Sequence, residues 1–151
     1  MQFADVLAIV AAFNRESVHY KVIGGVATNL HGIPRATEDA DFLIDPAAAN
    51  VAAMKRALRS IWDDPHVDEI RDDDMLSEFP LLTYRAPDAA FCVNFYAALP
   101  YDSFDATTMD VRGLPVSIVA ADVLYQMKRA TLRYKDSADA IYLRERFDFA
   151  E

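Results

Sequence analysis

Two aspartates separated by one residue, Asp39 and Asp41, are the side chains in this sequence best suited to chemistry. If the segment that carries them is a strand, both carboxylates project from one face, because side chains alternate along a strand. Two neighbouring oxygen ligands suit Mg²⁺, which binds a couple of carboxylates together with water and substrate phosphate. The pair therefore predicts a magnesium site that acts on a phosphate-bearing substrate.

The residues before the aspartate pair fit the same chemistry. Gly24-Gly25 follows an apolar stretch, and glycine lets backbone N–H groups approach a ligand because it has no Cβ. A helix that starts there offers N–H donors to phosphate, and Arg35 can hold a phosphate oxygen through two donors at once. Each signal is weak alone, because Gly-Gly is an ordinary turn and Asp-x-Asp is common on solvated strands. Their order and spacing favour a metal and phosphate site.

Hydrophobic spacing predicts the elements that must position these residues. Helices are expected over 2–15, 26–31, 47–62, 120–132 and 137–147, and strands over 20–23, 38–44, 81–84, 90–96, 109–112 and 115–119. This order predicts an α/β (α+β) fold in which a small mixed sheet is flanked by helices. We expect a single domain over residues 1–151.

Two charged residues near this site have alternative interpretations. Asp45 precedes Pro46, a pair typical of a helix start, so we interpret Asp45 as a helix cap rather than a third acid of the site. Lys128 lies one turn after Leu124 on the core-facing side of its helix. It either contacts phosphate there or extends its charge to solvent.

The charge of the chain is unevenly distributed. Hydrophobic residues make up 53% of the sequence and charged residues 26%, as in a globular protein, and the formal net charge is −9. Residues 63–78 hold eight acids against Arg71 alone, so we expect a solvated loop or a partner-facing edge there. The acidic balance argues against strong nonspecific nucleic-acid binding, although residues 126–135 contain four cations and no acid.

The sequence does not predict a secreted or membrane protein. The N-terminal stretch lacks a basic start and carries Asp5, and no apolar run approaches the ~20 residues of a membrane-spanning helix. The single cysteine, Cys92, excludes an internal disulfide and is expected to be buried. A cytoplasmic location is therefore the expectation.

The order of the motifs resembles the nucleotidyltransferases of the DNA-polymerase-beta-like superfamily. Within it, the chain looks similar to small bacterial proteins related to nucleotidyltransferase toxins of the abortive-infection type. Family members place a strand, a Gly-Gly or Gly-Ser pair and a helix before Asp-x-Asp, and that branch carries the form Arg-x-Thr-x-Asp-x-Asp. The matching positions here are Gly24, Gly25, Arg35, Thr37, Asp39 and Asp41. The resemblance covers about 20–45 and 110–143; the second range includes Lys128, Arg133, Lys135, Asp136 and Asp139.

The resemblance implies the nucleotidyltransferase fold and transfer of a nucleoside monophosphate from an NTP to a hydroxyl of RNA or tRNA, a protein or a small molecule. Asp39 and Asp41 would hold one or two Mg²⁺ ions, which stabilise the attacking and leaving oxygens. The nucleotide-binding set would be Gly24, Gly25, Arg35, Thr37 and Lys128. A toxin–antitoxin or phage-defence setting, with an antitoxin protein as partner, is also implied. No membrane partner is expected, and a homo-oligomer is left open.

One position departs from the family pattern. Family members carry a third carboxylate on a later strand, and the matching residue here is Asn94. Asn offers its carbonyl oxygen to a metal but does not accept a proton at neutral pH. Either Asp88 or Asp102 replaces the missing acid from a nearby loop, or the hydroxyl is activated in another way, or catalysis is impaired.

Three functions therefore compete. The leading one is the transferase. Impaired catalysis predicts instead a nucleotide-binding or partner-binding protein without efficient transfer, since general-base assistance contributes about 10²–10⁴-fold. A sugar-nucleotide glycosyltransferase marked by Asp-x-Asp is the third, and it is less well supported because Gly24-Gly25 has no role in it.

Overall fold

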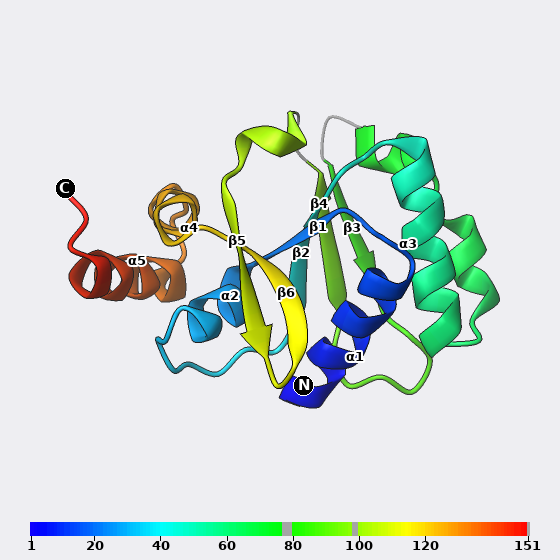
Figure 1. The fold of residues 1–151 in the computed structure, drawn as a ribbon, viewed down its shortest axis with the longest axis horizontal. Coiled ribbons are helices and arrows are strands. Elements are labelled where there is room, and N and C mark those ends of the chain that lie inside the picture. The colour runs from blue at the N-terminus through cyan, green and yellow to red at the C-terminus, as the bar shows by residue number, and fades with distance from the viewer. Residues whose placement is uncertain (77–79, 98–99, 151) are drawn as a thin grey trace.

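Residues 1–76, 80–97 and 100–150, which the computed structural model describes, form a six-stranded mixed sheet with helices on both of its faces (Figure 1). The helices are α1 (Phe3–Arg15), α2 (Gly24–Leu30), α3 (Ala48–Ile61), α4 (Ala121–Arg129) and α5 (Tyr134–Phe147). The strands are β1 (Tyr20–Ile23), β2 (Ala40–Ile44), β3 (Leu81–Tyr84), β4 (Val93–Ala97), β5 (Ala106–Val111) and β6 (Leu114–Val119). Short 3₁₀ helices lie at Pro65–Glu69, Asp72–Leu76 and Tyr101–Ser103. The predicted fold class is confirmed.

The register of the sheet brings the candidate site residues into one row. The strand order is β3-β4-β2-β1-β6-β5, with β2 parallel to β4 and antiparallel to β1. Paired positions on four neighbouring strands are Thr83, Asn94, Asp41 and Ile23. Paired residues point to the same side of a sheet, so these four side chains share one face.

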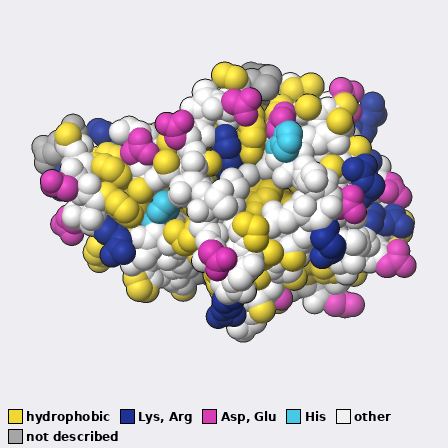
Figure 2. Space-filling view, viewed as in Figure 1, with side chains coloured by type: hydrophobic (Ala, Val, Ile, Leu, Met, Phe, Trp, Pro, Cys, Tyr) yellow, Lys and Arg dark blue, Asp and Glu magenta, His cyan; other side chains and the backbone are white. Residues whose placement is uncertain are grey.

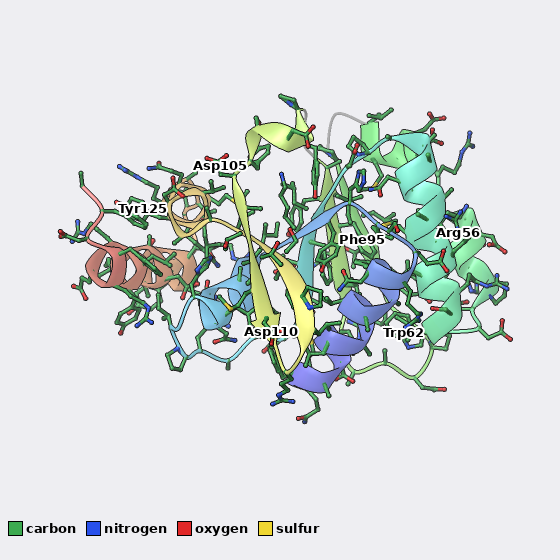
Figure 3. The ribbon with its side chains drawn as sticks, viewed as in Figure 1. Arg56, Trp62, Phe95, Asp105, Asp110 and Tyr125 are labelled. Atoms are coloured by element: carbon green, nitrogen blue, oxygen red, sulfur yellow. The ribbon has the colours of Figure 1, made fainter. Side chains whose placement is uncertain are left out.

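The next row of the sheet points to the opposite face and builds the hydrophobic core. Phe42 and Phe95 are fully buried there, and the ring of Phe13 from α1 lies 5.2 Å from Phe42 and 6.3 Å from Phe95. Helices α1 and α3 cover this face, and Phe95 lies on the sheet beneath them (Figures 1 and 3). Burial of such side chains contributes about 1.5–3 kcal/mol each. This packing fixes β2 and β4, the strands that carry Asp41 and Asn94.

The other face of the sheet is bordered by the remaining helices. Helix α2 packs against β1, β2 and α4, and α5 packs against α4 at one end of the molecule (Figure 1). Leu124 of α4 and Leu143 of α5 are fully buried and join this end to the core. Within the described ranges, no helix combines the length and the apolar character that crossing a membrane requires.

Several element boundaries differ from the prediction. Strand β2 starts at Ala40 rather than at position 38, because the Thr37 hydroxyl donates to the Asp39 carbonyl at 3.1 Å and turns the chain there. Asp39 therefore precedes the strand instead of lying in it. Helix α2 begins at Gly24, two residues earlier than expected, and α4 ends at Arg129, three residues earlier. The predictions for β1 and β3 are confirmed.

Asp45 does not cap α3 as predicted. Its Oδ1 accepts a hydrogen bond from the Ala47 N–H at 3.1 Å, and α3 begins one residue later without a side-chain cap. Asn50 holds this turn instead, donating Nδ2 to the Asp45 carbonyl at 2.8 Å. The prediction was wrong because the hydrogen bond from Ala47 to Asp45 closes a tight turn that ends before α3 begins.

The acidic segment is more ordered than a solvated loop. It contains two of the 3₁₀ helices, and Val67 and Met75 are buried in the core. Arg59 of α3 pairs with Asp63 at 3.5 Å and with Asp68 at 2.8 Å. Figure 2 shows these signs of charge intermixed along the edge over α3. Positive side chains of α3 thus lie among the acids of this segment. Glu78, one of the eight acids, lies outside the described residues.

Candidate active site

The carboxylate of Asp41 lies directly against Gly24. Ile23 pairs with Asp41 across β1 and β2, so the next residue stands beside the carboxylate where the chain turns into α2. A Cβ placed on Gly24 would stand 2.2 Å from Oδ2 of Asp41. The φ of Gly24 is +68°, a conformation that favours glycine. Glycine is therefore required here both for the backbone turn and for the approach of the carboxylate.

The loop before β2 is held against α2 by Gly25 and Thr37. A Cβ on Gly25 would stand 2.7 Å from Oγ1 of Thr37, so a side chain there would displace the loop. Beyond Thr37, Oδ1 of Asp39 accepts the backbone N–H of Cys92 at 3.3 Å. Cys92 itself is half-buried rather than buried as predicted. These contacts bring Asp39 next to Asp41.

Asn94 is linked to Asp41 by a hydrogen bond across the sheet. Its Nδ2 donates to Oδ1 of Asp41 at 2.8 Å, while its Oδ1 accepts the Thr83 hydroxyl at 2.8 Å. The carbonyl oxygen expected to face a metal is thus turned toward β3. Asn94 presents N–H groups, not an oxygen, to the aspartate pair.

Both aspartates line one cavity of about 410 Å³. The residues predicted to bind nucleotide line it as well: Gly24, Gly25, Arg35, Thr37 and Lys128. Another part of the wall is apolar or aromatic, formed by Ile23, Leu43, Tyr96, Phe104, Leu124 and Met127. The structure therefore brings together every predicted site residue except Asn94, which contacts Asp41 without lining the cavity.

The surroundings leave Asp41 short of positive charge. Burial raises its pKa; the hydrogen bond from Asn94 opposes this shift, and the charge of Asp39 adds to it. Lys128 and Arg133 lower the same pKa from a distance. The aspartate pair is therefore a place where a cation would be stabilised.

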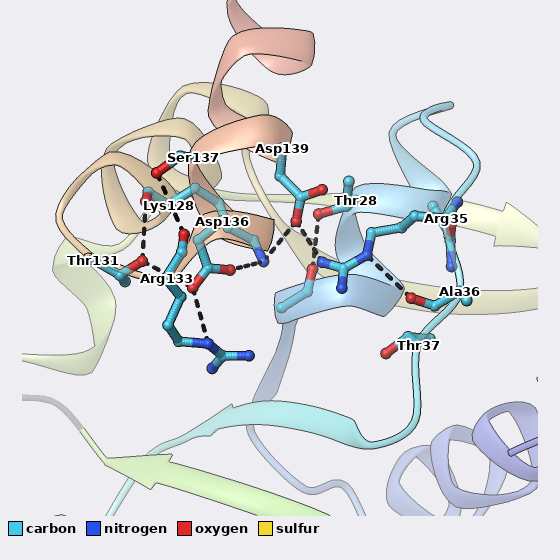
Figure 4. A network of polar contacts seen from close by, with 12 residues as sticks. Thr28, Arg35, Ala36, Thr37, Lys128, Thr131, Arg133, Asp136, Ser137 and Asp139 are labelled. Carbon is cyan, nitrogen blue, oxygen red and sulfur yellow. Dashed lines mark hydrogen bonds and ion pairs between the residues drawn. The ribbon is translucent and has the colours of Figure 1, made fainter.

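Two of the cations that line the cavity, Lys128 and Arg35, are held by two buried acids of α5 (Figure 4). Nζ of Lys128 donates to Asp136 at 2.7 Å and lies 3.0 Å from Oδ2 of Asp139. Arg35 pairs with the same oxygen of Asp139, and Thr131 donates to Asp136 at 2.8 Å. The side chain of Lys128 is only 8% exposed, so the alternative in which it extends to solvent is wrong. A phosphate bound beside Lys128 and Arg35 would therefore meet two cations that are already paired with acids.

The two loop acids considered as replacements for a third carboxylate lie elsewhere. Asp88 lines a separate hollow with His66, and Asp102 lines another with Tyr20. Among the described residues, no group of three or more His, Cys, Asp or Glu side chains is placed to hold a metal ion. Neither acid therefore substitutes for the missing carboxylate.

Sequence reasoning did not single out Tyr96. It lies two positions after Asn94 on β4, and strand alternation places the two on one face, which is a signal that could have found it. Burial raises the pKa of Tyr96, and the charge of Asp41 adds to this shift. The link from Arg35 to Asp139 has no comparable local signal, because 104 positions separate them.

Comparison with known proteins identifies the fold. In sequence, the chain matches no protein-family model and no curated protein. In structure, it is similar to the lincosamide antibiotic adenylyltransferase LnuA in its lincomycin-bound form, with a TM-score of 0.64 and 11% identity over 95% of this chain and 97% of that one. It is also similar to ANT(2″)-Ia in complex with adenylyl-2″-tobramycin, with a TM-score of 0.59 and 10% identity over 95% and 88% of the two chains. A candidate nucleotidyltransferase from Thermotoga maritima is similar as well, with a TM-score of 0.55 and 13% identity over 98% of this chain and 96% of that one.

The chain therefore has the nucleotidyltransferase fold, matched over nearly its whole length. At identities of 10–13% the likeness defines the fold alone. It gives no support to the toxin branch in particular, and the branch and the acceptor stay predictions.

Proposed function

We propose that this protein transfers a nucleoside monophosphate from a nucleoside triphosphate to a hydroxyl group, with Mg²⁺ bound by Asp39 and Asp41. The observation that carries the proposal is the close approach of Asp41 to Gly24 in a cavity that also contains Asp39 and Lys128. An acidic pole, a glycine turn and cations in one cavity suit a metal–triphosphate complex. The fold is consistent with this activity.

The donor set fits Mg²⁺. The ion prefers oxygen ligands and is usually held by one or two carboxylates, with phosphate and water completing its shell. Asp39 and Asp41 supply those carboxylates, and burial together with the neighbouring charge already raises the pKa of Asp41. When bound, Mg²⁺ would offset the charge of the triphosphate and of the departing pyrophosphate.

The chain's own residues would bind and orient the nucleotide. Gly24 and Gly25 line the cavity and would present backbone N–H groups to the triphosphate, while the absence of a side chain at either position makes room for Asp41 and Thr37. Lys128 lines the same cavity and would share its charge between Asp136 and the phosphates. Arg35 also lines the cavity and would share its charge between Asp139 and the phosphates.

The acceptor proposed for this site is a small hydroxyl-bearing molecule. The neighbours named above were solved with lincomycin and with adenylyl-tobramycin, so this fold accommodates small hydroxyl-bearing molecules. The apolar and aromatic wall, which includes Leu43, Tyr96 and Phe104, favours a small molecule with an apolar body over RNA or a protein chain. RNA or tRNA, an antitoxin partner and a homo-oligomer stay hypotheses from the motif resemblance.

A second candidate function is nucleotide binding without efficient transfer. Asn94 favours it, because the amide cannot take a proton from the attacking hydroxyl, and the described part of the chain contains no group of three acids, His or Cys placed to hold a metal. The two functions share a binding site and differ in turnover.

The test measures binding and transfer separately. Calorimetry with Mg-ATP and Mg-CTP gives the affinity, and labelled NTP with bulk tRNA, the protein itself or a panel of hydroxyl-bearing small molecules gives transfer. We expect Asp41→Ala to abolish Mg²⁺-dependent binding, a larger loss than the roughly 10–100-fold typical of residues that only support a metal ligand. Asp102→Ala, an acid in another hollow, is the matched control.

Three results decide between the functions. Transfer that needs Asp41 supports the enzyme. Binding without transfer to any acceptor supports the second candidate. If Asp41→Ala binds Mg-ATP as tightly as the native chain, the site assignment is wrong.

A further inference from the structure

The row of residues across β3, β4 and β2 forms a hydrogen-bond chain with a fixed direction. The Thr83 hydroxyl donates to Oδ1 of Asn94, and Nδ2 of Asn94 donates to Oδ1 of Asp41, both at 2.8 Å. The amide has one oxygen and one NH₂ group, so binding Thr83 through the oxygen turns the NH₂ group to the carboxylate. The reverse orientation would place two oxygen acceptors face to face.

This orientation changes what Asp41 can offer. Its Oδ1 is covered by an N–H donor, which carries a partial positive charge and repels a metal ion on that side. Its Oδ2 faces Gly24 and the cavity. A cation can therefore bind where Asp41 and Asp39 meet the cavity, but not between Asp41 and Asn94.

The rest of the site offers no replacement for the missing oxygen. Asn94 does not line the cavity. Glu38 and Asp136 do line it, but no group of three or more His, Cys, Asp or Glu side chains among the described residues is placed to hold a metal ion. Tyr96 of β4 lines the cavity, but it offers a neutral phenol hydroxyl and not a carboxylate. The protein thus supplies two carboxylates, whose charge balances one divalent ion.

We infer that Asn94, oriented by Thr83, limits this site to one divalent cation, held with the nucleotide between Asp39 and Asp41. The inference rests on the proposed function, because it assumes that the aspartate pair binds the metal–nucleotide complex. Asn94 is a positioning residue in this arrangement. Its N–H places a partial positive charge against Oδ1 of Asp41, where a second cation would otherwise bind.

The experiment counts ions rather than turnover. The native chain is saturated with a non-hydrolysable ATP analogue, and bound Mn²⁺ per chain is measured by electron paramagnetic resonance and equilibrium dialysis. We expect one Mn²⁺ in the native chain. Asn94→Asp supplies the missing oxygen ligand and is expected to bind two, the second at least about tenfold more tightly than any second ion of the native chain.

Two further variants separate charge from orientation. Asn94→Leu removes the amide without adding a carboxylate and is expected to keep one ion. Thr83→Val removes the hydroxyl that orients the amide, so its oxygen can turn to Asp41, and a weak second ion is expected. Thermal unfolding shows whether each variant is folded. Adding Mn²⁺ should raise the unfolding temperature of Asn94→Asp more than that of the native chain.

Each outcome has one meaning. Two ions in the native chain overturn the inference and leave the proposed function standing. A folded Asn94→Asp variant that still binds one ion also overturns it, because Asn94 would not be the limiting residue. No ion in the native chain overturns the proposed metal site and the inference together.

Discussion

The cavity has two charged regions that are built in opposite ways. In the carboxylate region, Asp39 and Asp41 lie together and receive hydrogen bonds from a backbone N–H and from Asn94. In the cation region, Lys128 and Arg35 are each paired with buried acids of α5. The first region lacks opposing charge and the second already contains it.

This difference shows which half depends on a ligand. A buried ion pair that is complete within the protein keeps its geometry without substrate, although its desolvation makes it a weak source of stability. Two neighbouring carboxylates without a cation repel each other, and this repulsion is relieved only when a cation arrives. The cation region is therefore preorganised, whereas the carboxylate region would be completed by the cation that we propose it binds.

The largest effect should come from breaking the cation region. Lys128→Met leaves Asp136 and Asp139 buried without their shared partner and should lower the free energy of unfolding by about 3–5 kcal/mol. The control is Arg56→Met, which removes an exposed pair with Glu16 and should cost no more than about 1 kcal/mol. Urea denaturation measures both. Equal losses would show that the buried network has no special structural role.

A smaller effect should come from crowding the carboxylate region. Gly24→Ala forces an alanine to φ +68° and brings its Cβ to 2.2 Å from Asp41, which together should cost about 2–3 kcal/mol and weaken Mg-ATP binding. Gly113→Ala is the matched control, because Gly113 has φ +82° with nothing within 4 Å of its Cβ position. It should cost about 1–2 kcal/mol and leave binding unchanged. If both variants bind Mg-ATP like the native chain, contact with Asp41 does not matter for the ligand.

The smallest effect should appear in the acid dependence of stability. Burial pushes the pKa of Asp136 up, but hydrogen bonds from Lys128 and Thr131, together with the charges of Lys128 and Arg133, outweigh burial and hold this pKa below the ordinary value of 3.8. As the pH falls, the carboxylate of Asp136 is therefore protonated in the unfolded chain before it is protonated in the folded chain. The resulting stabilisation is present above pH 3.8 and is lost as the pH falls through the lower, folded-state pKa. Unfolding measured from pH 6 to 3 should show a shallower loss for Asp136→Asn, and parallel curves would contradict this.

The sequence allowed much of the carboxylate region to be predicted, because its parts are close in the chain. Alternation along one strand and a glycine turn one strand earlier were enough to expect Asp41 near Gly24, and the structure places them in contact. The strand itself begins after Asp39, a detail set by the hydroxyl of Thr37. Local periodicity does not report such side-chain bonds.

The partners of Asn94 and of the cations could not be predicted in the same way. Thr83 meets Asn94 only because β3 pairs with β4 in a particular register, and register depends on the packing of the whole sheet. Arg35 meets Asp139 only because α5 docks on α4 at one angle and not another. The resemblance pointed to Lys128, but not to the acids that hold it.

The pairing of Arg35 with Asp139 has a consequence for how the protein is made. Asp39 and Asp41 come early in the chain, whereas Lys128, Asp136 and Asp139 are synthesised later, as parts of α4 and α5. A nascent chain lacking α5 presents the aspartate pair and Arg35 with no counterpart across the cavity. The paired cation region therefore forms only after α5 has been synthesised and has docked on α4.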